Sequence, residues 1–103
     1  MSTSRATVDH LLEQLEPLPV RARAMFGEHA LYCDEKVVAL ICDDTVFLKP
    51  TAASDGLAEG PPYPGAKPYR IADDAVIADA ERFQALVRAT ADALPPPKPR
   101  RAR

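Results

Sequence analysis

Residues 21–50, RARAMFGEHALYCDEKVVALICDDTVFLKP, decide the fold of this 103-residue chain. Residues 20–25 alternate with period two, which predicts a half-exposed strand. Three further apolar runs follow at residues 30–33, 37–42 and 45–48, joined only by the polar segments DEK and DD. Such short joints predict consecutive antiparallel hairpins. The run VVALIC is apolar on both sides, so we expect it in the centre of the sheet. Helices would cover one of its faces, and a partner subunit is one candidate cover for the other.

Two amphipathic segments flank these strands. The first has the i, i+3, i+4, i+7 spacing of a helix and contains Val8, Leu11, Leu12 and Leu15. The second contains Phe83, Leu86, Val87, Thr90 and Leu94. We expect Thr3 or Ser4 to cap the first helix and Asp79 to cap the second, because short polar side chains satisfy the free N–H groups of a first turn.

The segment between these two regions predicts a weak short helix within residues 51–60 and a last strand at residues 68–71. Taken together, the elements predict an α+β fold of two layers. An antiparallel sheet of four to five strands is packed by N- and C-terminal helices, in the order α-β-β-β-β-α-β-α. Residues 1–94 form the expected domain, and residues 95–103, PPPKPRRAR, are expected to be a disordered basic tail.

The charge of the chain is divided unevenly. Net charge is −2, but the last six residues contain Lys98, Arg100, Arg101 and Arg103. The rest of the chain carries nine basic and 15 acidic residues. This balance disfavours a domain with a broad basic face for nucleic acid, so only the tail is suited to contact a polyanion. No apolar run approaches the roughly 20 residues that span a bilayer, and we expect a cytoplasmic protein without membrane contact.

Reactive chemistry is not predicted. His29 and Cys33 lie four positions apart, which on a strand separates them by about 13 Å, so a histidine-activated thiol is disfavoured. Cys33 and Cys42 fall in apolar runs, and together with His29 and His10 they lack the close ligand pairs of structural zinc sites. We therefore predict no catalytic residues, no metal and no cofactor.

The most distinctive polar segment is YPGAKPYR, residues 63–70. It combines two aromatic rings and two cations on a stiff backbone, so we take Tyr63, Lys67, Tyr69 and Arg70 as candidate binding residues. The alternative is a structural connector whose prolines shape the entry into the last strand. The tail likewise has two interpretations, a contact with a polyanion or a solubilising end.

Several of these residues also resemble a known family. Arg23, Met25, Phe26 and Gly27, with Lys49 at the end of the run VFLK, are similar to the N-terminal domain of the TfoX/Sxy proteins, regulators of bacterial natural competence. The resemblance implies a two-layer α+β fold and a non-enzymatic regulatory role, exerted together with a transcription activator. It also implies a stand-alone member, because competence regulators carry a second helical domain where this chain has its tail. Glu28-His29 stands where the family often has a second glycine.

Two functional hypotheses follow. The first is a regulatory domain that binds a protein, with a second copy of the chain and the transcription machinery as the candidate partners. The alternative is a weak nucleic-acid binder that uses the basic tail and the segment from Tyr63 to Arg70.

Overall fold

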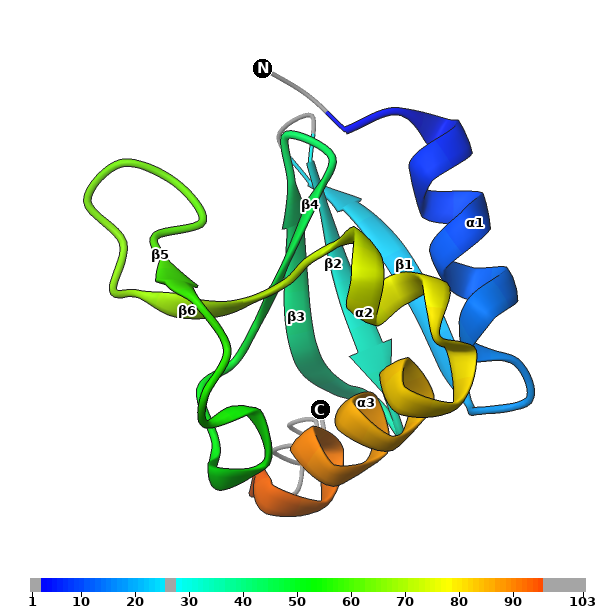
Figure 1. The fold of residues 1–103 in the computed structure, drawn as a ribbon. Coiled ribbons are helices and arrows are strands. Elements are labelled where there is room, and N and C mark those ends of the chain that lie inside the picture. The colour runs from blue at the N-terminus through cyan, green and yellow to red at the C-terminus, as the bar shows by residue number, and fades with distance from the viewer. Residues whose placement is uncertain (1–2, 26–27, 96–103) are drawn as a thin grey trace, which may run out of the picture.

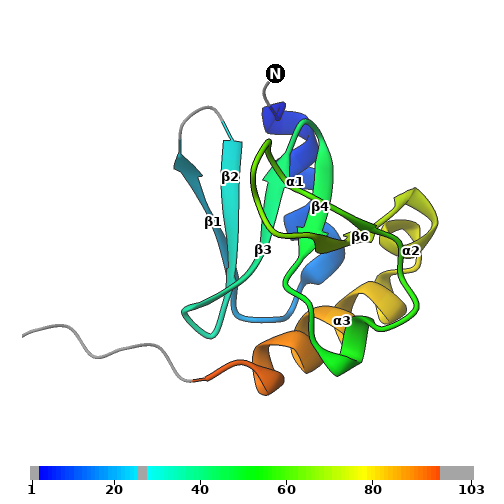
Figure 2. The same cartoon turned by 90° about the vertical axis from the view of Figure 1, so that its left-hand side faces the viewer.

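The computed structural model describes residues 3–25 and 28–95 and contains one antiparallel sheet with its helices on one face (Figures 1 and 2). The strands are β1 (Val20–Met25), β2 (Glu28–Cys33), β3 (Lys36–Cys42), β4 (Thr45–Leu48), β5 (Glu59–Gly60) and β6 (Tyr69–Ala72). The helices are α1 (Arg5–Leu15), the short 3-10 helix η1 (Ala52–Ser54), α2 (Asp74–Ala78) and α3 (Ala80–Ala93). No helix in the described ranges is both long enough and apolar enough to cross a membrane.

The hairpins on either side of β3 use two-residue turns. Cys33 pairs with Lys36 and Cys42 pairs with Thr45, so each turn consists of two acidic residues. All four turn residues have positive φ, 54° and 63° in the first turn and 52° and 58° in the second. Positive φ at both positions is the type I′ geometry, whose twist matches that of the flanking strands. Aspartate tolerates this region better than most residues with a side chain.

The strand order is β1-β2-β3-β4-β6-β5, so β3 lies inside the sheet as its sequence predicts. The expected fold class and order of elements are confirmed. The sheet has six strands in the described residues, because the two-residue β5 adds to the edge of β6. The sequence predicted α3 with its cap at Asp79 but did not predict the short helix α2 before it. Asp73 caps α2 by accepting from the Val76 N–H, and Asp79 caps α3 by accepting from the Arg82 N–H.

The core lies between the sheet and the helix layer. Leu11 and Leu15 of α1 and Phe83 and Val87 of α3 are all at most 1% exposed. The pairing of β2 with β3 is irregular at Leu31 and Tyr32 and leaves Val38 out of the ladder. The helix layer is also tied to the sheet by a lysine, since Lys36 Nζ donates to the carbonyls of Ala91 (2.8 Å) and Leu94 (3.3 Å) at the end of α3. A cation there satisfies carbonyls that the helix itself leaves free.

The turn at Asp43 provides a test of this geometry. Asp43→Val is expected to lower the free energy of unfolding by about 1–2 kcal/mol, because a β-branched side chain is disfavoured at positive φ. Asp43→Asn keeps a residue that type I′ turns favour and should change stability by less than about 0.5 kcal/mol. Urea denaturation of the two variants measures both values. Equal stability of the two would contradict the assigned turn.

Candidate functional site

The face of the sheet opposite the helices carries large apolar side chains. Residues paired across neighbouring strands point to the same face, and successive residues alternate. The register Leu40↔Phe47↔Ile71 therefore places these three side chains in one row on that face. Tyr32 lies on the same face, as does Tyr69, two residues from Ile71. We call the surface formed by Tyr32, Leu40, Phe47, Tyr69 and Ile71 the open face; all five are partly exposed.

One edge of the open face is formed by arginines of β1. The Arg21 guanidinium lies 4.1 Å from the centre of the Tyr32 ring, its cross-strand neighbour. The same guanidinium donates to both carboxylate oxygens of Glu35, at 2.9 and 3.1 Å, which lowers the pKa of Glu35. The carboxylate thus holds the cation over the ring, an arrangement typical of an exposed cation–π pair. Arg23 is exposed beside it and forms no ion pair within the described part of the chain.

The loop before β6 forms the opposite edge. Tyr63 is 57% exposed, which makes it the most exposed large hydrophobic side chain in the described residues, and Lys67 is exposed as well. Tyr69 is half-buried, and burial raises the pKa of its hydroxyl, with smaller contributions from Tyr63 and Cys42. Tyr63, Lys67 and Tyr69 thus give this edge of the open face two aromatic rings and a cation.

Arg70 lies apart from the other candidate residues, because strand alternation turns its side chain toward the helix layer. Its guanidinium contacts Glu59 at 3.1 Å and Asp55 at 3.3 Å and donates to the Leu57 carbonyl at 3.4 Å. Its side chain is only 21% exposed, and its Nε is buried without a hydrogen-bond partner in the described structure. The contacts join β6 to the segment after η1, so Arg70 fixes the base of the loop that presents Tyr63 and Lys67.

The residues that carried the family resemblance are distributed around the same sheet. Arg23 and the backbone of Met25 belong to β1, and Lys49 follows β4, where its N–H donates to the Val38 carbonyl at 2.9 Å. Phe26 and Gly27 lie outside the described residues, as do the tail cations Lys98, Arg100, Arg101 and Arg103.

The open face was only partly visible in the sequence. The two-sided apolar pattern of VVALIC predicted that helices cover one face of β3 and that another element, such as a partner subunit, covers the second face. It did not show that Phe47 and Ile71 line up beside Leu40, since that depends on the pairing of β4 with β6 across a connection of 20 residues, 49–68. The signal available in sequence is an apolar or aromatic side chain on the solvent side of β2, β3, β4 and β6.

Both cysteines lack the features of a nucleophile. Burial raises the pKa of the Cys33 thiol, although the Arg88 guanidinium, 3.5 Å from its Sγ, acts in the opposite direction. Burial is also the main cause that raises the pKa of Cys42, followed by the charge of Glu28. Cys33 and His29 share strand β2, and the described residues contain no group of three or more metal-ligating side chains.

Comparison with known proteins identifies the class. Residues 10–94 of this α+β domain match the family model of the TfoX N-terminal domain. The chain belongs to this family, whose members are associated with the regulation of competence. It is also 51% identical to an uncharacterised 12.7 kDa protein in the trpE 5′ region of Spirochaeta aurantia, over all of this chain and 93% of that protein.

Glu28, which differs from the glycine often found in the family, connects the N-terminal segment to the sheet. Its Oε1 accepts from the Thr3 hydroxyl at 2.7 Å and from the Asp43 N–H at 3.1 Å. The Thr3 hydroxyl in turn accepts from the Asp44 N–H at 3.1 Å. The carboxylate therefore stabilises both the start of the chain and the β3–β4 turn.

Replacement of Glu28 tests this role. Glu28→Gly is expected to lower the free energy of unfolding by about 1–2 kcal/mol, since a buried hydroxyl and a turn N–H lose an acceptor. Glu28→Gln keeps a carbonyl oxygen at the same place and should lose less. Thermal unfolding followed by circular dichroism measures the difference, and an unchanged stability in the glycine variant would show that the contacts are dispensable.

The cysteines give a second prediction. Because burial raises the pKa of both thiols, less thiolate is present at neutral pH than for a free cysteine, and access is restricted as well. Alkylation of the folded protein by iodoacetamide is expected to be slower than alkylation of the urea-unfolded chain by roughly a hundredfold or more at both positions. Peptide mass spectrometry resolves the two sites. Fast alkylation of folded Cys33 would identify a reactive thiol instead.

Proposed function

We propose that this domain is a cytoplasmic, non-enzymatic regulatory module that binds a protein partner through its open face. The observation that supports this proposal is the apolar row Leu40, Phe47 and Ile71 on the side of the sheet without helices. A sheet with one solvated face normally carries polar side chains there. These three side chains are partly exposed, and an apolar row open to solvent on a folded domain favours a docking site.

The composition of the open face favours a protein as its ligand. Tyrosine and arginine are the residues that protein interfaces use most as anchors, and here Tyr32 and Arg21 form a stacked pair. Glu35 already fixes the position of Arg21, so less side-chain entropy is lost when a partner docks.

The edges of the open face suggest the chemistry of the partner. Arg23 at one edge and Lys67 at the other are exposed cations, and Tyr63 stands beside Lys67 as an exposed ring. A partner surface with an apolar centre and an acidic rim complements this arrangement. A protein of the transcription machinery is the partner that the family's association with competence regulation favours.

The alternative, a weak nucleic-acid binder, has less support from the described surface. Arg21 is paired with Glu35, Arg70 with Asp55 and Glu59, and Arg88 with Asp34 and Asp92. Paired arginines contribute little to the release of counterions from a nucleic acid. The proposal for this function rests on Lys67 and on the four tail cations.

Matched substitutions test the open face. Phe47→Gln and Tyr32→Ser remove apolar surface from it, and Leu86→Gln makes the same kind of change on the half-buried side of α3. We expect at least one cellular protein, quantified by affinity capture and mass spectrometry, to bind the native chain and Leu86→Gln alike. Its recovery should fall by roughly fivefold or more with either open-face variant, because truncation of an interface anchor costs over about 1 kcal/mol. Thermal unfolding confirms that each variant is folded.

Two further measurements test the other possible ligands of the open face, which are a second copy of the chain and a nucleic acid. Sedimentation velocity detects a second copy, which would appear as a dimer that Phe47→Gln dissociates. Anisotropy of a labelled DNA duplex at several salt concentrations detects nucleic acid. If no protein is lost from the open-face variants, and DNA binding is weakened by Lys67→Gln or by removal of the tail cations, the nucleic-acid function replaces the one proposed here.

A further inference from the structure

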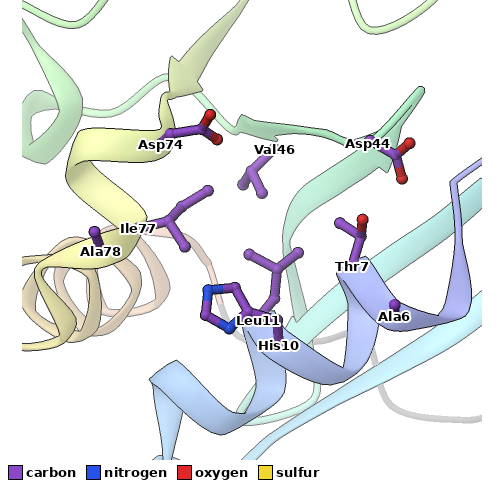
Figure 3. Close-up of a pocket in the computed structure, with 9 residues that line it drawn as sticks. All are labelled: Ala6, Thr7, His10, Leu11, Asp44, Val46, Asp74, Ile77 and Ala78. Atoms are coloured by element: carbon purple, nitrogen blue, oxygen red, sulfur yellow. The ribbon is translucent and has the colours of Figure 1, made fainter.

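A cleft opens in the helix layer, on the other side of the sheet from the open face (Figure 3). It lies between α1, the start of β4 and α2, and its volume is about 650 Å³. This volume is within the range of roughly 300–1,000 Å³ typical of ligand sites. The cleft exists because α2 is only five residues long and because the facing residues, Ala6 of α1 and Ala78 of α2, have small side chains.

The floor of the cleft is apolar and belongs to the core. Leu11 and Val46 are each 1% exposed, and Ile77 of α2 completes this surface. Since Leu11 and Val46 are held from beneath by the sheet and by α1, the floor is preformed. Ligand binding would therefore lose no conformational entropy through ordering of the floor.

Two carboxylates stand on opposite walls. Figure 3 shows Asp74, in the first turn of α2, and Asp44, in the β3–β4 turn, on either side of Val46. Neither forms an ion pair with a described residue, and no lysine or arginine lines the cleft. The Ser4 N–H donates to Asp44 at 2.9 Å and is the largest cause that lowers the pKa of this carboxyl, with a further contribution from Thr7. Asp44 is therefore ionised at neutral pH.

The arrangement of these groups excludes some ligands and favours others. A bound metal ion is disfavoured, because no group of three or more ligating side chains occurs in the described residues. An anion is disfavoured by the two unpaired carboxylates. A cationic group alone would leave uncovered the exposed apolar part of the lining, which is Ala6, Ile77 and Ala78. The ligand that matches both the floor and the walls has an apolar centre with a positive charge at each side.

We propose that this cleft is a second docking site, which takes a basic segment of a protein, with one apolar side chain on the floor and an arginine or lysine directed to each of Asp44 and Asp74. The long aliphatic stems of lysine and arginine suit the edges of an apolar floor, with the charged ends at the solvent-exposed carboxylates. The site lies on the opposite layer from the open face, so the two can be occupied at the same time.

Three capped tripeptides probe the full chain in NMR titrations. The first has the order arginine, leucine, arginine; the second replaces leucine by glycine; the third replaces both arginines by glutamate. The first is expected to cause saturable shifts at Leu11, Val46 and Ile77, with an affinity that falls as salt is added. The glycine peptide should bind at least about threefold more weakly, since it buries less apolar surface. The glutamate peptide should cause no shifts in the cleft.

Variants of the protein distinguish binding in the cleft from general electrostatic attraction of the peptide to the protein. Asp44→Asn and Asp74→Asn are each expected to lower the affinity for the arginine–leucine–arginine peptide by roughly two- to fivefold, the range for exposed ion pairs. The controls Asp43→Asn, in the same turn, and Glu81→Gln, in the first turn of α3, remove one charge outside the cleft and should leave the affinity within error. Asparagine is also favoured in type I′ turns, so Asp44→Asn should fold.

Two results would overturn this inference: shifts that map away from Leu11, Val46 and Ile77, or equal weakening by the cleft variants and their controls. Phe47→Gln, on the open face, is expected to leave the peptide affinity unchanged. A result that contradicts peptide binding in the cleft can therefore be distinguished from one that contradicts partner binding at the open face.

Discussion

The two-residue turns on either side of β3 are the constraint on which the rest of the domain depends. Both residues of each turn have positive φ. The two strands that each turn joins, β2 with β3 and β3 with β4, are therefore antiparallel neighbours with a fixed register. A slip by one residue would move Ile41 and Leu48 to the open face and would remove the surface on which α1 and α3 pack. The packing of Leu11, Leu15 and Phe83 against the sheet depends on that register.

The same register gives the sheet two different apolar faces. One is covered by α1, α2 and α3, whereas the other is covered by no helix in the described chain. Polar contacts at the edges of the sheet hold neighbouring segments in position. Arg70 joins β6 to the segment after η1 through Asp55 and Glu59, and Lys36 closes the end of α3. None of these contacts lies over the row of Leu40, Phe47 and Ile71, which stays partly exposed and is the surface proposed here for a partner.

The N-terminal segment connects the two surfaces on which function is proposed. Thr3 contacts Glu28 and the Ile41 carbonyl, and Ser4 contacts Asp44. These bonds hold the start of α1 against the β3–β4 turn and so fix one wall of the cleft, while Glu28 also holds the turn itself. A glycine at position 28 could provide neither contact. Glu28 therefore has a structural role in this chain, independent of any partner.

The sequence by itself determined the fold class, the hairpins and the central place of β3, since alternation, short acidic joints and helical stripes are local patterns. It also determined the cap at Asp79 and limited the first cap to Thr3 or Ser4, of which the structure uses Ser4, because a cap depends on one side chain and the turn beside it. Only the tertiary structure decided that the side chains of Tyr69 and Arg70 lie on opposite faces of the sheet and that Arg21 is held over Tyr32. It also decided that Asp44 and Asp74, which are 30 residues apart in sequence, line the same cleft. Those arrangements depend on the pairing of β4 with β6 and on the docking of α1 and α2, because contacts between distant segments leave no periodic signal in the chain.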